Sequence, residues 1–340
     1  MSLRALLVTG LCSGGLLVLM VVSACVGRFP LPVGQVLHTL LAAAGMVRHA
    51  TGGRADMVHT IVFGARLPRI GGAVCVGAAL SVAGAAYQAV FRNPLVSPGL
   101  LGVLAGAGTG AALGIVWNLG HGGVAGLSFL GGLAAVGFGV GIAQVFDATS
   151  MMMLVFGGLI SSALFTALLS LLKYVADPQN QLPDIVFWLL GSLTQVTPGA
   201  LGVLAGPVVA GIVLLSACGR MLDGLAMGDE EARTLGIPVV ALRYGVIGAA
   251  TVLAALTVSV AGMIGWVGLV VPHVARLLVG PCNMRVLPVS ACLGAMFLLS
   301  CDDLARTLSA EEIPVGLIAD LLGVVVFISV LPLLRRGWRA

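Results

Sequence analysis

Residues 66–103 read RLPRIGGAVCVGAALSVAGAAYQAVFRNPLVSPGLLGV. Beyond the arginines at its start, the stretch stays apolar and uncharged to residue 91, longer than the roughly 20 residues that an α-helix needs to cross a bilayer. Pro94 and Pro98 then interrupt the run, and a second apolar run begins at Gly99. A long apolar helix, a short break and another apolar helix predict a chain that crosses the membrane repeatedly.

The composition of the whole chain agrees with this pattern. Of its 340 residues, 59% are apolar and only 9% are charged, whereas soluble domains have about 45–50% apolar and about 25% charged residues. Lipid must therefore be the solvent for most of the chain. The 49 glycines suit membrane helices that pack closely. We predict an all-α, polytopic integral membrane protein with one transmembrane domain over residues 1–340.

Ten apolar runs are long enough to be membrane spans. They cover residues 5–26, 66–90, 99–117, 123–146, 151–173, 198–218, 240–261, 263–280, 286–306 and 314–334. Ten spans place both termini on one side. Ten of the 17 Lys and Arg residues fall on that side, which favours a cytoplasmic location for both termini. Val22–Cys25 resembles a lipoprotein cleavage box, but the run before it is long enough to be a retained first span.

A short internal match indicates a repeat. Residues 81–84 read SVAG, as do residues 259–262, and a proline follows each copy at Pro94 and Pro272. The shift covers five spans, an odd number, so the two halves would have opposite orientations in the membrane. Inverted repeats are typical of transporters, whose pathway lies between the halves.

The polar connection at residues 219–239 reads GRMLDGLAMGDEEARTLGIPV. The acids at 229–231 favour a helix N-terminus, while Gly236 and Pro238 favour its end. We predict one helix of about two turns on the inner surface. It is either part of an ordinary loop or a rigid element that docks on a cytoplasmic partner.

Three arginines are expected at the outer face: Arg66 and Arg69 open the second span and Arg306 ends the ninth. They could anchor helix ends at the lipid headgroups or present positive charge to an acidic partner. The residues alone favour anchoring.

Two proline-broken stretches, residues 91–99 and 262–273, predict irregular backbone at membrane depth. Such backbone survives only where protein or a water-filled path satisfies its polar groups, so we expect both stretches to belong to a pathway or gate. The candidate residues are Asn93, Pro94, Pro98, Gly265, Pro272 and His273. We expect neighbouring backbone carbonyls, rather than a metal, to bind His273.

The chain lacks catalytic and phosphate-binding motifs, metal-ligand clusters and the basic footprint of a nucleic-acid binder. We therefore expect neither an enzyme nor a cofactor or metal site, and an intramembrane enzyme would lack its catalytic pair. Uphill transport would need another chain or an ion gradient. Asp320 is the lone acid within a predicted span, so it is the candidate ion site of a secondary transporter, although it could also lie in water near the outer end of that span.

Several stretches together resemble the FecCD-type permeases of ATP-binding-cassette importers for iron complexes and cobalamin. Besides residues 66–103 they are WLLGSL (188–193), LAMGDEEARTLGIP (225–238), GLVVPHVARLLVGP (268–281), LPVSACLGA (287–295), DDLAR (302–306) and EIPVG (312–316). They occur in the family's order over nearly the whole chain. Met263, Val96-Ser97, Asp320 and Val324-Val325 depart from the family pattern, which leaves the cargo open.

The resemblance implies a homodimer in the bacterial inner membrane, with ten helices per subunit and a pathway on the twofold axis. It implies a cytoplasmic ATPase dimer and a periplasmic or lipid-anchored binding protein that delivers a siderophore, haem or cobalamin. The inner helix would dock into the ATPase, and Arg66, Arg69 and Arg306 would meet acids of the binding protein. The ATPase-coupling residues would be Gly228, Asp229, Glu230, Glu231, Ala232, Arg233, Leu235 and Gly236.

Overall fold

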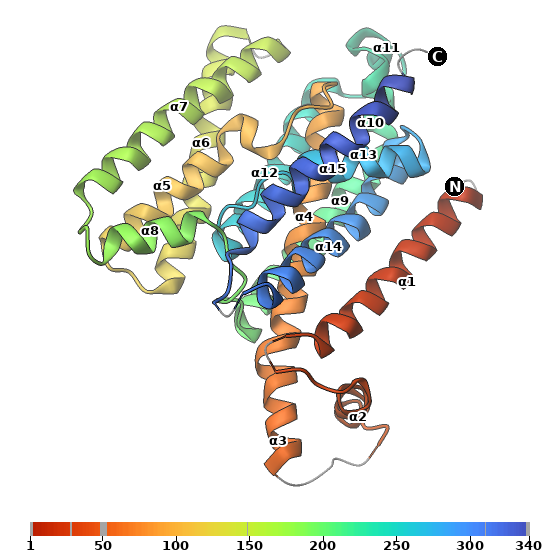
Figure 1. Ribbon diagram of the computed structural model, residues 1–340. Helices are drawn as coiled ribbons and strands as arrows, with labels where there is room; N and C mark the ends of the chain where they lie inside the picture. Colours follow the sequence, from red (N-terminus) through yellow and green to blue (C-terminus); the bar gives the residue numbers. More distant parts are fainter. Residues whose placement is uncertain (1–2, 28, 48–52, 148, 310, 338–340) are drawn as a thin grey trace.

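The computed structural model describes residues 3–27, 29–47, 53–147, 149–309 and 311–337, and these residues form helices without strands (Figure 1). The helices are α1 (Leu3–Cys25), α2 (Val33–Ala43), α3 (Gly53–His59), α4 (Leu67–Phe91), α5 (Val103–Val116), α6 (His121–Asp147), α7 (Met151–Val175), α8 (Gln181–Leu189), α9 (Pro198–Ala217), α10 (Gly219–Met227), α11 (Asp229–Thr234), α12 (Val239–Ala261), α13 (Val267–Val279), α14 (Asn283–Thr307) and α15 (Val315–Gly337). A π-helix at Thr60–Arg66 joins α3 to α4, and a 3₁₀ helix at Pro98–Leu101 precedes α5.

Ten of these helices correspond to the ten predicted spans: α1, α4 to α7, α9 and α12 to α15. Eight described segments are long and apolar enough to cross a membrane. The helices α5 and α13 are shorter than predicted because residues 98–101 form a 3₁₀ helix and residues 262–266 are not helical. The two proline-broken stretches therefore shorten the helices that follow them.

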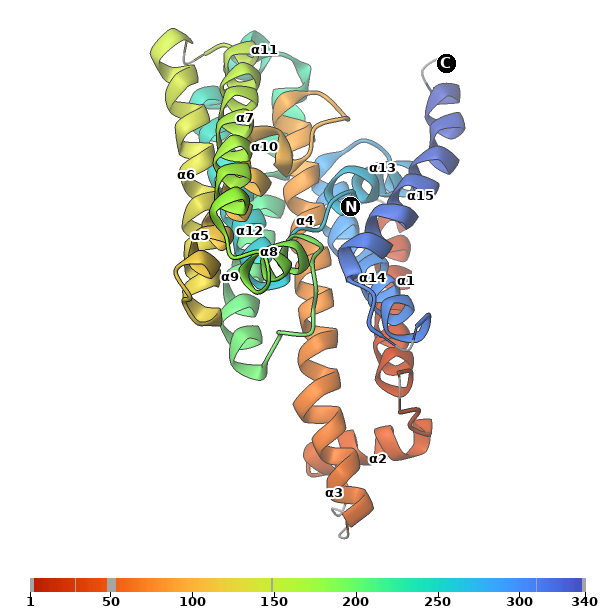
Figure 2. The ribbon, with the colours of Figure 1, turned by 60° about the vertical axis from the view of Figure 1, so that its left-hand side comes forward.

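The connections contain helices that the apolar pattern did not predict. The helices α2 and α3 lie in the connection at 27–65, and α8 lies in the connection at 174–197. Because α3, the π-helix and α4 are continuous, the second apolar segment runs over 37 residues, Ala55–Phe91. Its α3 end projects beyond the bundle, next to α2 (Figure 2).

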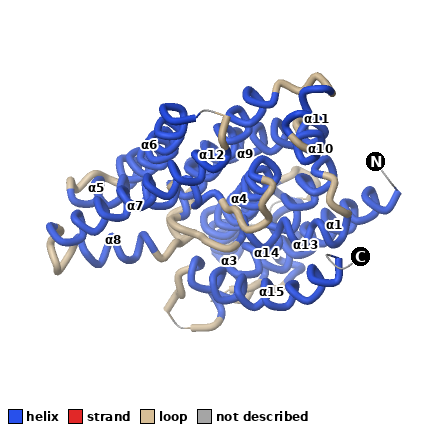
Figure 3. Tube along the Cα trace, turned by 90° about the horizontal axis from the view of Figure 1, so that it is seen from above, coloured by secondary structure: helices blue, strands red, loops and turns tan. Residues whose placement is uncertain are grey.

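The core of the bundle forms around α4, whose apolar window is 83% buried. Seen from above, α5 to α8 gather on one side of α4, and α1, α13, α14 and α15 lie on the other (Figure 3). A Cβ on Gly77 would overlap the carbonyl group of Gly294 on α14. Glycine at this crossing thus permits backbone contact, which van der Waals packing between membrane helices requires.

Side-chain contacts show the relative directions of the helices. From Arg69–Asp302 to Ser81–Ser290, residue numbers rise along α4 as they fall along α14, so these helices are antiparallel. The first described residues of α1 and the last of α15 lie at the same end of the bundle as α11 (Figure 1). Both described ends of the chain therefore share one end of the bundle, as ten crossings require.

The SVAG match does not extend to local structure. Residues 81–84 lie inside α4, seven residues before its end, whereas α12 ends at Ala261 and Gly262 follows with φ of +70°. Within α4, Gly84 packs against Gly268, and a Cβ there would overlap the Gly268 backbone. The first copy therefore lies within a helix, whereas the second copy lies at a helix end.

Candidate functional site

A cavity of about 390 Å³ lies where the two proline-broken stretches meet. Ser97 comes from the first stretch, and Met263, Gly265 and Trp266 come from the second. The full lining is Ser97, Leu104, Leu189, Leu190, Met263, Gly265, Trp266, Leu269, Leu317 and Asp320. Residues from four distant parts of the sequence thus line one largely apolar space, as is typical of ligand sites in membrane bundles.

Irregular backbone shapes one wall of this cavity. After α12 ends, Gly262 turns with φ of +70°, and a Cβ there would overlap the carbonyl oxygen of Trp188. The Ser192 N–H donates to the Ala261 carbonyl over 2.8 Å, which satisfies a polar group at the end of α12. Trp266 has φ of +46°, an unusual value for a bulky residue. Backbone strain of this kind concentrates at binding sites and switch regions.

Asp320 is the one charged residue in the lining. Its Oδ1 would lie 2.8 Å from a Cβ on Gly265. The carboxyl group therefore lies directly against the second proline-broken stretch at Gly265. Asp320 thus lines the cavity, and it is also exposed near the start of α15, so both locations considered for it are compatible with the structure.

The remaining predicted gate residues do not line the cavity. A Cβ on Gly268 would contact Pro98 at 3.2 Å, so the two stretches touch. The Asn93 side chain accepts a hydrogen bond from Leu95 N at 2.9 Å and turns the chain after α4. His273 is buried in α13, one residue after Pro272, and its Nδ1 lies 2.7 Å from the Leu269 carbonyl oxygen. That contact with a backbone carbonyl is the one expected from the sequence.

The connection at 219–239 forms two helices, α10 and α11, and not the single two-turn helix that was predicted. Gly228 separates them with φ of +140°, and Gly236 ends the second with φ of +76°. The sequence analysis missed α10 because its short mixture of polar and apolar residues resembles a loop. Glu230 and Leu235 are exposed on α11, whereas Ala232 is fully buried under it.

Asp229 turns inward from the start of α11. One carboxylate oxygen pairs with Arg92 at the end of α4, and the other accepts from Arg243 Nη2 on α12 over 2.7 Å. Arg243 is 1% exposed and also donates to the Thr149 carbonyl oxygen over 3.1 Å. Burial works to raise the Asp229 pKa, but the hydrogen bonds and charges of Arg243 and Arg92 outweigh it and hold that pKa below its usual value.

Asp223 fixes α10 in a similar way. Its Oδ1 accepts from the Asn283 backbone N–H at 2.6 Å and from the Asn283 side chain at 2.9 Å. Asn283 begins α14, so the carboxylate satisfies free N–H groups at that helix N-terminus. Each helix of the connection is thereby attached to the membrane bundle through one carboxylate.

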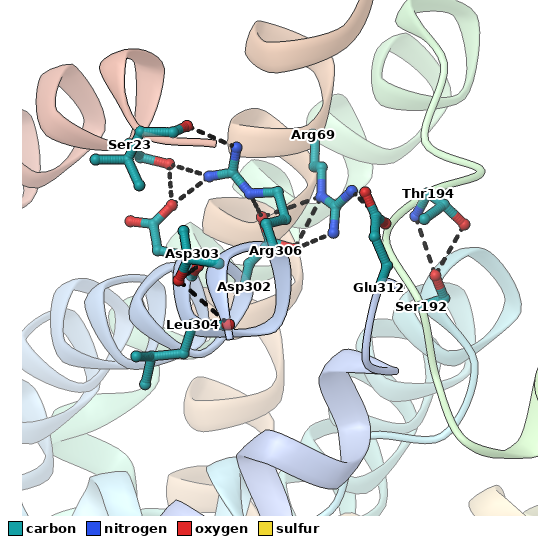
Figure 4. A network of polar contacts seen from close by, with 11 residues as sticks. Ser23, Arg69, Ser192, Thr194, Asp302, Asp303, Leu304, Arg306 and Glu312 are labelled. Atoms are coloured by element: carbon teal, nitrogen blue, oxygen red, sulfur yellow. Dashed lines mark hydrogen bonds and ion pairs between the residues drawn. The ribbon is translucent and has the colours of Figure 1, made fainter. Parts of the chain in front are cut away.

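At the other end of the bundle, Arg69 and Arg306 point toward carboxylates of the protein itself (Figure 4). Arg69 pairs with Asp302 and with Glu312, each at 2.9 Å, and Arg306 pairs with Asp302 at 3.1 Å and with Asp303. Ser23 on α1 donates to Asp303 at 2.6 Å. Arg66 donates to the carbonyl oxygens of Ala24 and Phe29. We call Ser23, Arg69, Asp302, Asp303, Arg306 and Glu312 the outer network.

The family model of the FecCD transport family matches residues 15–332. The chain belongs to the FecCD transport family. It is 37% identical over 324 residues to the molybdate import system permease MolB of Haemophilus influenzae, covering 95% of this chain and 94% of that protein. It is 37% identical over 275 residues to the hemin transport system permease HmuU of Yersinia pestis, covering 79% and 82% of the two chains.

Two further matches support the same conclusion. The cobalamin import permease BtuC of Halobacterium salinarum is 36% identical over 277 residues, which cover 81% of this chain and 74% of that one. A solved structure described as an inward-facing metal-chelate type ABC transporter matches with a TM-score of 0.84 and 33% identity, covering 95% of this chain and 98% of that chain. The FecCD chain is therefore a multi-pass membrane permease component of ABC importers, which confirms the resemblance drawn from the sequence.

In this FecCD permease, Gly265 is the gate candidate that lines the cavity, and α11 lies at one end of the bundle. Sequence reasoning quoted Ser97, Met263 and Trp266 within its stretches but did not select them as site residues, and it missed Arg243. A signal existed for Trp266, because a bulky residue follows glycines in an irregular stretch. No local signal could have paired Arg243 with Asp229, because that pairing depends on how α11 folds back on α12.

Proposed function

We propose that this permease forms the translocation pathway of an ATP-driven importer as a homodimer. A cytoplasmic ATPase dimer would supply the energy, and a periplasmic or lipid-anchored binding protein would deliver the cargo. The permease would catalyse no covalent chemistry and would need no cofactor or metal of its own. Membership of the FecCD family supports this assignment. In a bacterial inner membrane, the end with α11 and both chain ends would face the cytoplasm.

For the cargo we propose an iron complex, either a siderophore chelate or haem, or a cobalamin. The observation that carries this proposal is the cavity, whose lining is apolar apart from Ser97 and one carboxylate and contains no basic side chain. Like charges 4 Å apart repel by about 4 kcal/mol at an effective dielectric constant of about 20. Asp320 thus disfavours a small oxyanion such as molybdate and favours an uncharged or cationic complex.

For ATPase coupling we propose the surface of α11. Glu230 is 84% and Arg233 is 51% exposed in their side chains, and Leu235 adds an exposed apolar contact. The remaining members would shape the element: Gly228 and Gly236 set its ends, Ala232 packs beneath it, and Glu231 lies in its first turn. For the gate we propose Asn93, Pro94, Pro98, Gly265, Pro272 and His273, which belong to the two proline-broken stretches that contact each other at Pro98 and Gly268.

Docking of the binding protein at Arg66, Arg69 and Arg306 stays a prediction. In the free chain, internal acids and carbonyl oxygens already bind these guanidinium groups. Acids of a binding protein would therefore have to compete with Asp302, Asp303 and Glu312. This internal pairing favours a structural role for the three arginines over a role in docking.

The decisive experiment is uptake into proteoliposomes that contain the permease with its cognate ATPase and binding protein. We expect ATP-dependent uptake of cyanocobalamin or of a ferric hydroxamate chelate, and no uptake of molybdate. ATP-dependent uptake of molybdate alone would overturn the cargo proposal. The absence of any ATP-dependent uptake would overturn the importer proposal.

A second candidate function follows from the location of Asp320 at the cavity. An ion-gradient-driven secondary transporter would use this carboxyl group as its proton or sodium site. Such a transporter would move cargo in vesicles that lack the ATPase and would lose that activity in Asp320→Asn. We expect no gradient-driven uptake without the ATPase, and we expect Asp320→Asn to retain ATP-driven uptake of an uncharged cargo within about threefold, because a hydrophobic site discriminates weakly between such variants.

A further inference from the structure

We infer that Asp229 is a positioning residue that connects the ATPase-coupling helix α11 to the gate stretch after α4. This inference rests on the proposed importer function. On this inference, Asp229 does not contact the ATPase. It transmits the displacement of α11 to residues 92–98. We call Arg92, Asp229 and Arg243 the inner clamp.

The geometry of the inner clamp gives each carboxylate oxygen its own partner. Arg92 pairs with Oδ1 and Arg243 Nη2 donates to Oδ2. Two partners on separate oxygens fix both the position and the rotation of the carboxyl group. Since Asp229 is the first residue of α11, the clamp holds the whole helix by its N-terminal end.

Arg92 lies at the junction of α4 and the gate stretch. It ends α4 with a left-handed backbone conformation, φ of +48°. Five residues later, Ser97 lines the cavity. A displacement of Asp229 therefore reaches the cavity through a short, irregular segment in which Pro94 limits the available conformations.

Arg243 supplies the fixed side of the clamp. Its side chain is 1% exposed, and besides Asp229 it donates to the carbonyl group of Thr149, which follows α6. Its Nε has no partner in the part of the chain that the structure describes. Loss of Asp229 would leave this buried cation without a carboxylate, a costly arrangement that favours rearrangement of the clamp.

The anchoring of α10 makes this transmission directional. Asp223 holds α10 on the first residues of α14, while Asp229 holds α11 on α4 and α12. Between the two anchors, Gly228 has φ of +140°, a conformation open to glycine and strained for other residues. A push on α11 can therefore turn it about Gly228 relative to α10 and displace Arg92 while α14 stays in place.

The test compares variants in the reconstituted complex of permease, ATPase and binding protein. We expect Asp229→Asn to assemble and to hydrolyse ATP at the basal rate but to import about tenfold less cargo per ATP, a loss typical of coupling between distant sites. Arg92→Gln, on the more exposed arm, should reproduce this loss, and Asp229→Glu should restore part of it. The double variant should be no worse than either single variant, because both remove one interaction.

Asp184→Asn is the matched control, since it makes the same substitution at an exposed acid of α8 outside the clamp, and it should import normally. Cargo import per ATP within twofold of the unmodified complex in Asp229→Asn would overturn the inference. Additive losses in the double variant, or failure of Asp229→Asn to bind the ATPase, would also overturn it. Failure of the importer proposal is separate, because the unmodified complex itself would then show no ATP-dependent import.

Discussion

The two ends of the bundle both carry arginine–carboxylate clusters, but these clusters are built differently. In the outer network, the Asp302 side chain has no exposed surface and is shared by Arg69 and Arg306 on two helices. In the inner clamp, Asp229 and Arg92 are each about one third exposed, and only Arg243 is fully buried. The outer network joins α1, α4 and α14, whereas the inner clamp joins a short surface helix to the bundle. The difference indicates a rigid end and an end that can move.

The largest effect is expected at the centre of the outer network. Asp302→Ala would leave the buried Arg69 and Arg306 without their shared carboxylate, and losing one partner of a buried pair costs about 3–5 kcal/mol. We expect a large fall in thermal stability of the purified permease in detergent. Glu311→Ala, at an exposed acid nearby, should leave the unfolding temperature unchanged. Equal stability of the two variants would contradict a structural role for the outer network.

At the inner clamp, loss of the buried Arg243 should lower the stability of the permease more than loss of the more exposed Arg92. Arg243→Met removes charged hydrogen bonds to Asp229 and Thr149, each worth about 1.5–3 kcal/mol, while Arg92→Met removes a half-exposed pair worth about 0–1 kcal/mol. Thermal unfolding should therefore rank both Asp302→Ala and Arg243→Met below Arg92→Met. If Arg92→Met were the least stable of the three, the contrast between the two ends would fail.

The pH dependence of the inner clamp has a defined sign. Because the folded-state pKa of Asp229 lies below its usual value, the clamp contributes stability above the usual Asp pKa of about 4 and loses it as pH falls through the folded value. The difference in unfolding temperature between the unmodified permease and Asp229→Asn should be constant from pH 8 to about pH 5 and shrink below about pH 4. A difference that grew on acidification would show that the carboxylate is not the stabilising form.

The smallest effect is expected on the outward face of α11. Glu230 and Arg233 pair at 3.1 Å on neighbouring turns, but both are exposed, and such helix-surface pairs are worth about 0.2–0.5 kcal/mol. Glu230→Ala should leave the unfolding temperature nearly unchanged and weaken binding of the ATPase. If a pull-down titration showed unaltered ATPase affinity, it would contradict the proposed docking of the ATPase on this surface.

Much of the fold followed from local sequence. The bounds of α6, α7, α9 and α12 lie within two residues of the predicted spans, because apolar length is set by bilayer thickness. The helices α2, α8 and α10 were missed because short amphipathic helices in connections resemble loops in composition. The arginines were expected to face outward, and their pairing with acids of the same chain was not visible in the sequence. Arg69 and Asp302, for example, are 233 positions apart.

The sequence by itself determined that lipid surrounds this chain, where it crosses the membrane and which family it belongs to, since apolar length and local motifs are properties of contiguous residues. Tertiary structure alone decided what the charges among residues 66–103 do. Arg69 belongs to a buried network at one end, Arg92 to a clamp at the other, and Ser97 to the cavity between them. These roles depend on partners brought together by helix packing, and a buried charge is defined by its partners.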